Sequence, residues 1–598
     1  MPSQVSDERT HFLHRSVEPR LGQSPLGWGV VALAAIAIVD QLAVALRFGR
    51  HVAIEDQTIL WYAARDWGTG NVHAPNYTGQ IYGSTFEAVP TEVLRWFGIR
   101  PSTALPIVLT LLGLTPWILL GWILLRRERP IAALSAVAVP TVLSTYYSQY
   151  VSFYGAGAGR FLASLALVLV IGFPDRRMMF VVACAFGSFG SAIDGSALIL
   201  VAPVLAYGFL CSPRVERLAA AFAGFVPTLL WLFYVHQFYG THPDYDLHPP
   251  PSVLQLDVLR DAIGHPSRYW QMFAPELWRS WAIPFGLAVA LVVVLVATRR
   301  RRFVVPALTM TVLALVGLSS DRAAQGPSPL LPNSRIFLIV PLTLWFLAYL
   351  VAESEILRRW RHAFRALVLL VALLGVATVV VRQQTLTERN RALVVAAAHA
   401  RYVFPVVPVD ELDARCKRLS NLGRRTRIDL AVFTVDRASA YGCGAALYGE
   451  VRTLFPAYER RTWLLRDEAR RRRHRLLVVG VDPGWCTSVS PLVSSCKLAP
   501  LVPPATGFAA IVSFPQQSAI SLLRRLGLPV RRFGPGCHPR EPRTCSARTS
   551  RSARSLSIRR PRSAGSFDTW ASVVHWALER CAASTRPAPL PICSHSVK

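Results

Sequence analysis

Two neighbouring acidic residues, Glu55 and Asp56, follow closely on the first long apolar run of the chain. A carboxylate within hydrogen-bond reach of a hydroxyl group can take its proton while the oxygen attacks a carbon atom, which typically accelerates a reaction by about 10²–10⁴-fold. The aromatic residues Trp61 and Tyr62 come next, with Trp67, Trp96 and Phe97 further along the same loop, and such rings are favoured where a membrane meets water. We therefore predict an acid–base site at a membrane surface, with either carboxylate as the base.

The elements that must position this pair are apolar helices. The chain is 52% hydrophobic and only 17% charged, whereas soluble proteins contain about 25% charged residues. A helix needs about 20 apolar residues to cross a bilayer, and by this rule the sequence predicts a mainly α-helical, polytopic protein with about eleven spans. The predicted spans are Leu26–Phe48, Ala104–Leu125, Ile131–Tyr150, Phe161–Phe173, Met178–Ile193, Ser196–Leu210, Leu218–Phe238, Trp281–Ala297, Phe303–Ser319, Ile336–Val351 and Ala366–Val381.

The arginines predict which way the chain crosses the membrane. Cytoplasmic connections are enriched in Arg and Lys. Every second connection between the predicted spans is short and rich in arginine, namely 126–129, 175–177, 214–217, 299–302 and 358–365. The alternate connections are only weakly basic, and the longest are 51–103 and 239–280. We therefore expect a cytoplasmic N-terminal segment over residues 1–25, an uncleaved first span, and an external C-terminal region.

The net charge of +30 could in principle suit nucleic acid, for which a clustered basic face is typical. Here the arginines lie between apolar runs, where anionic lipid headgroups attract them. Membrane lipids are therefore the expected partners, and nucleic acid is not.

After Val381 the pattern changes. Short β-rich runs alternate with helical stretches, which predicts a small external α/β domain over residues 382–535. Cys416, Cys443, Cys486 and Cys496 fall here, and cysteines in an oxidising compartment commonly form disulfides. We expect Cys486 to pair with Cys496, although the sequence does not fix the connectivity. Residues 536–598 are rich in Arg, Ser and Pro and are expected to form a disordered tail.

The first external loop resembles that of the GT-C superfamily, integral membrane glycosyltransferases that take sugars from polyprenyl-phosphate carriers. Members carry an Asp or Asp-Glu pair early in this loop, followed by a juxtamembrane helix and a Tyr-Gly stretch. Asp56 matches the catalytic acidic position, with Glu55 beside it, and Tyr82, Gly83 and Glu87 match the later part. The resemblance covers approximately residues 26–381. The order here is Glu-Asp, where many relatives have Asp-Asp or Asp-Glu.

This resemblance implies a polyprenyl-phosphate-linked sugar as the donor, a glycan, lipid or protein as the acceptor, and inversion at the sugar carbon. It leaves open whether a divalent cation takes part. The leaving lipid phosphate needs cationic or hydrogen-bonding partners, and a tight external turn could contribute to the acceptor site. The candidates for these substrate-binding roles are Tyr82, Glu87, Arg160, Asp194, Arg335, His242, His248 and His265.

Structural roles compete with each of these assignments. Asp56, Glu55 and Glu87 could be solvated loop carboxylates, and an Asp-Gly sequence such as Asp194-Gly195 is an ordinary turn signal. The three histidines each precede proline, which is typical of turns. Asp40 lies within the first span, where a carboxylate is by default a functional candidate, but a neighbouring arginine could pair with it.

Two other functions remain open at this stage. A transporter or lipid-linked-sugar flippase would fit a polytopic chain, although transporters usually place ionisable residues and broken helices near the middle of the membrane. A non-catalytic protein of envelope assembly would also fit. A cytoplasmic nucleotide-sugar enzyme is disfavoured, because the sequence has no phosphate-binding Gly-Lys-Ser/Thr loop, and the glycine-rich run 155–159 is interpreted as a flexible turn or close helix packing.

Overall fold

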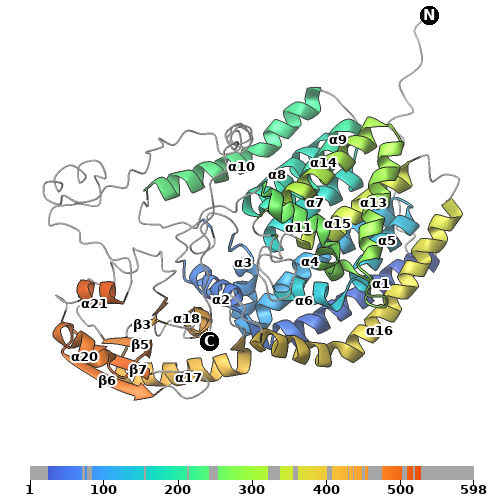
Figure 1. Ribbon diagram of the computed structural model, residues 1–598. Helices are drawn as coiled ribbons and strands as arrows, with labels where there is room; N and C mark the ends of the chain where they lie inside the picture. The colour runs from blue at the N-terminus through green and yellow to red at the C-terminus, as the bar shows by residue number, and fades with distance from the viewer. Residues whose placement is uncertain are drawn as a thin grey trace, which may run out of the picture. The chain divides into compact units, whose positions relative to one another are not determined.

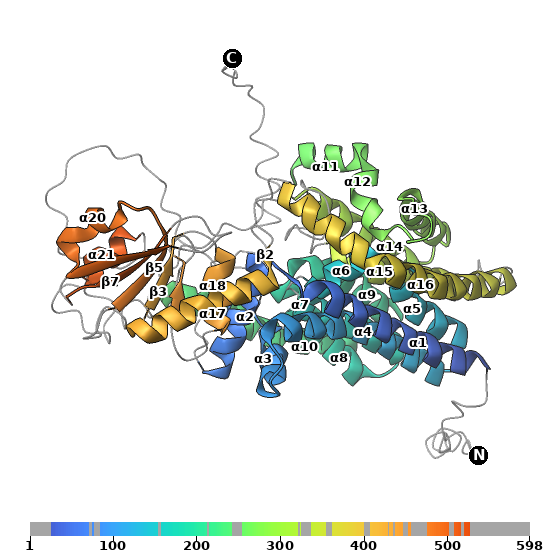
Figure 2. The same ribbon diagram turned by 90° about the horizontal axis from the view of Figure 1, so that it is seen from below.

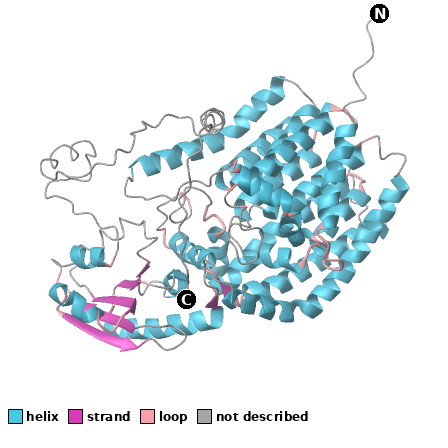
Figure 3. Cartoon of the chain, viewed as in Figure 1, coloured by secondary structure: helices cyan, strands magenta, loops and turns pink. Residues whose placement is uncertain are grey.

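The computed structural model describes residues 25–70, 75–76, 84–153, 157–211, 215–241, 254–320, 323, 337–354, 361–399, 407–428, 430–434, 437–446, 452–455, 475–500, 508–515 and 519–526. Helices dominate this part of the chain, and the strands are confined to one sheet and one short ladder (Figure 3). The predicted Cys537–Lys598 tail lies outside the described residues.

The helices up to residue 399 account for every predicted span. They are α1 (Pro25–Val44), α2 (Glu55–Gly68), α3 (Ala88–Trp96), α4 (Pro101–Arg126), α5 (Pro130–Val142), α6 (Thr145–Phe153), α7 (Gly157–Gly172), α8 (Arg177–Ile193), α9 (Leu198–Cys211), α10 (Val215–Thr241), α11 (Leu256–Gly264), α12 (Pro266–Trp270), α13 (Ala282–Ala297), α14 (Arg301–Leu318), α15 (Val340–Glu353) and α16 (Arg361–His399). Figure 1 shows most of them gathered into one bundle.

The described helices make the chain a multi-pass membrane protein. Five of them are long and apolar enough to cross a membrane, and a sixth span results if α5 and α6 count as one bent span. The remaining predicted spans are shorter apolar helices of 10–17 residues: α7, α8, α13, α15 and the stretch Gly195–Cys211. The span predicted over Ile131–Tyr150 is not one straight helix, because it bends by 88° between α5 and α6.

The arginine-rich connections meet at one end of the bundle. Arg127, after α4, donates to the carbonyl of Ile171 at the end of α7, and Arg129 pairs with Glu353 at the end of α15. At the starts of α8 and α10, Arg177 pairs with Glu216. These contacts bring together connections that the charge pattern assigned to the same side of the membrane.

Helix α16 is longer than the sequence predicted. The apolar run ends at Val381, yet the helix continues to His399, through residues that we had assigned to the external domain. Polar residues of α16 beyond Val381 make contacts inside the protein. The guanidinium of Arg382 is fully buried and pairs with Asp40 of α1, which confirms the arginine-paired alternative for that carboxylate.

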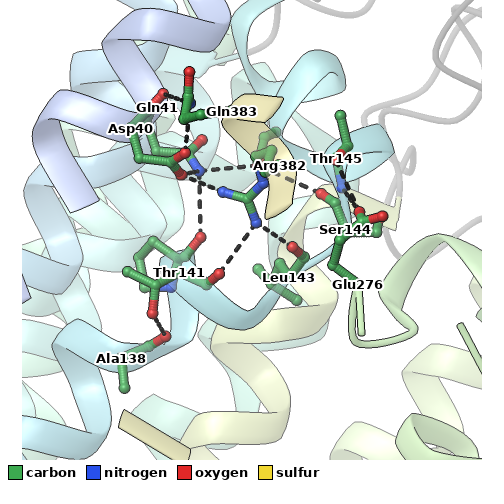
Figure 4. Close-up of polar contacts among 12 residues, drawn as sticks. Asp40, Gln41, Ala138, Thr141, Leu143, Ser144, Thr145, Glu276, Arg382 and Gln383 are labelled. Carbon is green, nitrogen blue, oxygen red and sulfur yellow. Dashed lines mark hydrogen bonds and ion pairs between the residues drawn. The ribbon is translucent and has the colours of Figure 1, made fainter. Parts of the chain in front are cut away.

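Arg382 also closes the break in the bent span. The backbone turns sharply between α5 and α6, which leaves carbonyl groups without helical partners. Arg382 donates to two of these carbonyls, those of Thr141 and Leu143, as Figure 4 shows. The side chain of Gln383 donates to the second oxygen of Asp40 over 2.8 Å, and Gln41 donates to Ser148 of α6 over 2.9 Å. One buried ion pair thus joins α1, α16 and both halves of the bent span.

The start of α6 is held by a second charged pair. Glu276 accepts hydrogen bonds from the backbone N–H of Thr145 over 2.6 Å and from its hydroxyl over 2.8 Å. Arg389, two turns beyond Arg382 on α16, pairs with Glu276 and donates to the Thr145 hydroxyl over 2.9 Å. A carboxylate at a helix N-terminus is favourable because the helix dipole is positive there.

The C-terminal region contains a five-stranded mixed sheet. Its order is β4-β3-β5-β7-β6, with β3 parallel to β4 and β5, and β7 antiparallel to β5 and β6. The elements are β2 (Val407–Pro408), α17 (Val409–Thr426), β3 (Leu430–Phe433), α18 (Arg437–Ala446), β4 (Arg452–Leu454), β5 (Arg475–Val481), α20 (Trp485–Val489), β6 (Ser495–Pro500), β7 (Phe508–Ser513) and α21 (Ala519–Arg525).

Two disulfides stabilise this region. The predicted pair Cys486–Cys496 is confirmed, and Cys416 of α17 pairs with Cys443 of α18. A disulfide stabilises mainly by restricting the unfolded chain, typically by about 2–4 kcal/mol. The ladder β1–β2 then connects the region to the first loop, because β1 (Val52–Ala53) pairs antiparallel with β2.

We expect the Asp40–Arg382 pair to be essential for folding. Removing one partner leaves a buried charge without compensation, which costs about 3–5 kcal/mol. Asp40→Asn and Arg382→Gln should therefore each lower the melting temperature of the purified protein sharply, and the double variant should lose less than the sum of the two. The exposed pair Arg177–Glu216 is the matched control, since exposed pairs contribute about 0–1 kcal/mol. Equal losses at both pairs would contradict this account.

Candidate functional site

The predicted acidic pair begins helix α2. Glu55 and Asp56 are its first two residues, and Gln57 accepts a hydrogen bond from the backbone N–H of Ile54 over 3.4 Å, which caps the helix start. Acidic residues are favourable in this first turn because of the helix dipole. The side chain of Asp56 is buried, with 8% exposure, so it is not the solvated loop carboxylate of the competing interpretation. The side chain of Glu55 lies outside the described residues.

Three other candidate residues come together at the start of α7. Glu87 precedes α3, and its Oε1 accepts a hydrogen bond from the backbone N–H of Ala158 over 3.0 Å. Arg160 and Asp194 both act electrostatically on the Glu87 carboxyl group. The loop, α7 and the end of α8 therefore each contribute one charged residue to a cluster, which we call the Glu87 cluster (Glu87, Arg160 and Asp194).

The glycines of the run 155–159 that the structure describes explain how these elements approach so closely. A Cβ atom at Gly159 would lie 2.5 Å from the Cβ of Asp194, and one at Gly157 would lie 3.7 Å from the Cγ of Glu87. Gly190 of α8 is equally crowded, because its Cβ would lie 2.6 Å from the Gly159 carbonyl oxygen. The prediction of close helix packing is confirmed at these positions.

Both acids of the cluster keep one oxygen without a partner. Asp194 accepts hydrogen bonds from the N–H and hydroxyl of Ser196 through Oδ1, so the interpretation of Asp194-Gly195 as a turn is confirmed, and Asp194 caps the short helix that follows. Its Oδ2, and Oε2 of Glu87, are buried and have no hydrogen-bond partner among the described residues. An unsatisfied buried polar atom costs about 1–3 kcal/mol. Such oxygens are suited to accept hydrogen bonds from a ligand that carries hydroxyl groups.

Burial also changes the ionisation of Glu87. Its side chain is fully buried, and the loss of solvation raises the pKa of this carboxyl group above its ordinary value. The Ala158 N–H and the charge of Arg160 lower the pKa, while the charge of Asp194 raises it further. A carboxyl oxygen accepts hydrogen bonds whether or not the group is ionised, so Oε2 of Glu87 can accept one from a ligand hydroxyl group.

The remaining candidates do not join this cluster. His265 is exposed and lies against Asp261, with its Nδ1 at 3.0 Å from the carboxylate, which fits the surface interpretation. Tyr82, Gly83, Arg335, His242 and His248 lie outside the described residues. No group of three or more His, Cys, Asp or Glu side chains suited to a metal ion occurs in the described part of the chain.

The aromatic prediction for the first loop was partly wrong. Trp61 and Tyr62 are buried, with 3% and 5% exposure, and pack in a core shared with the C-terminal region. Trp96 and Phe97 are exposed, at 70% and 78%, as residues at a membrane surface would be. The amphipathic pattern of α2 does not distinguish a lipid surface from a protein surface. Only the fold shows that α2 packs against protein.

The comparisons with known proteins add the following findings. No family model and no curated protein matches the chain. The chain is similar to the crystal structure of ArnT from Cupriavidus metallidurans bound to undecaprenyl phosphate, with a TM-score of 0.49 and 13% identity over 82% of this chain and 98% of that chain. The apo structure of the same protein gives a TM-score of 0.41 and 14% identity over the same shares.

The raised pKa of Glu87 predicts a pH dependence of stability. In the unfolded chain this carboxyl group ionises near its ordinary pKa of 4.5, whereas burial opposes ionisation in the folded protein. Above that pH the carboxyl group ionises more easily in the unfolded chain, which lowers the stability of the folded protein. Below that pH the group is protonated in both states, and this effect on stability disappears. Glu87→Gln should therefore raise the melting temperature at pH 7 and leave it nearly unchanged at pH 4. A variant that is less stable at pH 7 would contradict the assigned direction.

Proposed function

We propose that the chain is a glycosyltransferase that moves a sugar from a polyprenyl-phosphate donor to an acceptor at the external face of the membrane. The observation that carries this proposal is the Glu87 cluster, where two buried carboxyl oxygens without partners among the described residues lie near the cation Arg160. Sugar hydroxyls would bind the carboxyl groups, and the lipid phosphate would bind Arg160. The charge-assisted hydrogen bond between Arg160 and the phosphate would be about twice as strong as a hydrogen bond between neutral groups.

Asp56 is the proposed general base. Its carboxylate would take the proton of the acceptor hydroxyl as that oxygen forms a bond to the anomeric carbon of the sugar. The bond from this carbon to the phosphate oxygen breaks at the same time, and the polyprenyl phosphate leaves with the bonding electrons. Attack from the face opposite the leaving group inverts the configuration. The buried position of Asp56 supports this role, because electrostatic interactions are stronger where water is excluded.

The arrangement of the helices supports an external location of the site. The arginine contacts gather at the end of α7 near Ile171, whereas the Glu87 cluster contacts Ala158 at the start of this helix, about 20 Å away at 1.5 Å per residue. The arginine-rich end is cytoplasmic by the positive-inside rule, so the cluster and the N-terminus of the chain would lie on opposite sides. The two disulfides fit an oxidising external compartment.

Replacement of the proposed base tests the reaction. Purified protein in liposomes would be supplied with a panel of radiolabelled polyprenyl-phosphate sugars and cell-envelope extract, and the release of polyprenyl phosphate would be measured. Asp56→Asn should reduce release by at least about 10²-fold, the typical contribution of a general base. Glu55→Gln serves as the neighbouring comparison. Release that survives both substitutions would exclude the proposed mechanism.

The Glu87 cluster should affect donor binding more than turnover. Glu87→Gln keeps an acceptor for the Ala158 N–H but changes the group offered to a sugar hydroxyl. We expect Arg160→Gln to raise KM for the donor about tenfold or more, since a hydrogen bond to a charged group contributes about 1.5–3 kcal/mol. The exposed Arg268, which pairs with Asp261, provides the control Arg268→Gln. An unchanged KM in the Arg160 variant would remove this residue from the donor site.

One observation favours the alternative function of a transporter. Broken helices and buried charges are typical of transporter sites, and the bent span and the Asp40–Arg382 pair combine both features. However, the guanidinium of Arg382 already occupies the position beside the broken helix where a transported cation would bind. Transport assays in proteoliposomes distinguish the two functions, because a transporter moves its substrate without forming a covalent product.

A further inference from the structure

Helix α2 packs on α18 of the C-terminal region through a small set of close contacts. The rings of Tyr62 and Tyr441 meet edge to face, with centroids 5.9 Å apart. The guanidinium of Arg65 lies 5.5 Å from the Tyr62 ring centroid and donates to the carbonyl oxygen of Gly444 over 2.8 Å. Both views of the fold place α2 between α3 and α18 (Figures 1 and 2), so the C-terminal region forms one wall of the position that α2 occupies.

The fit at Gly444 allows no side chain. A Cβ atom there would lie 2.2 Å from the Thr453 hydroxyl oxygen and 2.3 Å from Cε2 of the Tyr62 ring. The close approach lets the Gly444 carbonyl reach Arg65 while the Tyr62 ring covers the α18 backbone. Gly484, in the same sheet region, has open space around the equivalent position. The crowding at Gly444 is therefore specific to the contact with α2 and the adjacent strand.

The segment before α2 is attached to the same region. Strand β1 pairs with β2, with Val52 opposite Pro408 and Ala53 opposite Val407, and the Val409 N–H donates to the His51 carbonyl over 2.9 Å. Because Asp56 lies between this ladder and the Tyr62–Arg65 contact, the chain on each side of it is fixed by residues 407–446. The disulfide between Cys416 and Cys443 links α17, which follows the ladder, to α18 next to Gly444.

We propose that Gly444 and Arg65 are positioning residues, through which the C-terminal region fixes α2 and thereby the carboxylate of Asp56 for catalysis. This inference rests on the proposed transferase function. Reactions are sensitive to such placement, since a displacement of about 1 Å at a catalytic group can reduce the rate by about 10²-fold. The Glu87 cluster is built from the α3, α7 and α8 segments rather than from α18, so we expect donor binding to be independent of the Gly444 contact.

Gly444→Ala tests the inference, with Gly484→Ala as the matched control. Hydrogen–deuterium exchange of the full-length protein in detergent would report on residues 55–68. We expect at least tenfold faster exchange of the α2 amides in Gly444→Ala and no change in Gly484→Ala. In the liposome assay, kcat should fall by about 10–100-fold in Gly444→Ala, while KM for the donor stays within about twofold.

A second pair of variants covers the case in which Gly444→Ala does not fold. Arg65→Met removes the donor to the Gly444 carbonyl without altering the C-terminal region, whereas Arg65→Lys keeps a donor. The inference predicts faster α2 exchange and lower kcat in Arg65→Met, with partial recovery of both in Arg65→Lys.

Unchanged exchange in α2, or unchanged kcat while Asp56→Asn still abolishes transfer, would overturn the positioning inference alone. Absence of transfer by the unaltered protein would overturn the proposed function, and the exchange data would still decide whether α18 fixes α2.

Discussion

A buried ion pair between Asp40 and Arg382 is the interaction on which the arrangement of the bundle depends. Inside a membrane, backbone carbonyls that lose their helical partners must be satisfied by other protein groups. The 88° bend between α5 and α6 creates such carbonyls, and Arg382 satisfies two of them while Asp40 balances its charge. Through this pair, α1 and α16 supply the polar groups that the sharp bend requires (Figure 4).

The same helix connects the membrane bundle to the segment that leads into α2. Beyond Arg382, α16 contributes Arg389 to the start of α6 and Asn390 to the carbonyl of Arg47 at the end of the first span. The C-terminal region then pairs with β1 and covers α2. The position of Asp56 is thus determined at one side by the bundle and at the other by the α/β region, which gives the C-terminal region a structural role at the proposed site.

The sequence predicted the helices well because membrane spans are defined by composition and length alone, and connections that the arginine pattern assigned to one side do contact one another at one end of the bundle. It also predicted the contribution of Asp194 to a turn and the Cys486–Cys496 pair. It could not predict the length of α16, because a polar residue such as Arg382 usually marks the end of a span and here is paired inside it. Nor could it show that Tyr62 faces α18, since a protein surface and a lipid surface favour the same amphipathic pattern.

The grouping of Glu87, Arg160 and Asp194 was likewise beyond sequence reasoning. Each residue was a candidate, but they come from three separate elements, and only the close packing at Gly159 and Gly190 brings those elements together. Glu276 and Arg389 were missed for the same reason, because their partnership with Thr145 depends on the bend between α5 and α6. The one signal available was the glycine-rich run before α7, which indicated an unusually close approach of helices.

An experimental structure of the protein with a bound polyprenyl phosphate would test the central claim most directly. The account predicts phosphate density within hydrogen-bond distance of Arg160, beside the carboxyl groups of Glu87 and Asp194, with the lipid chain leading into the membrane. Phosphate density at Arg382 or at the arginine-rich end of the bundle would contradict it.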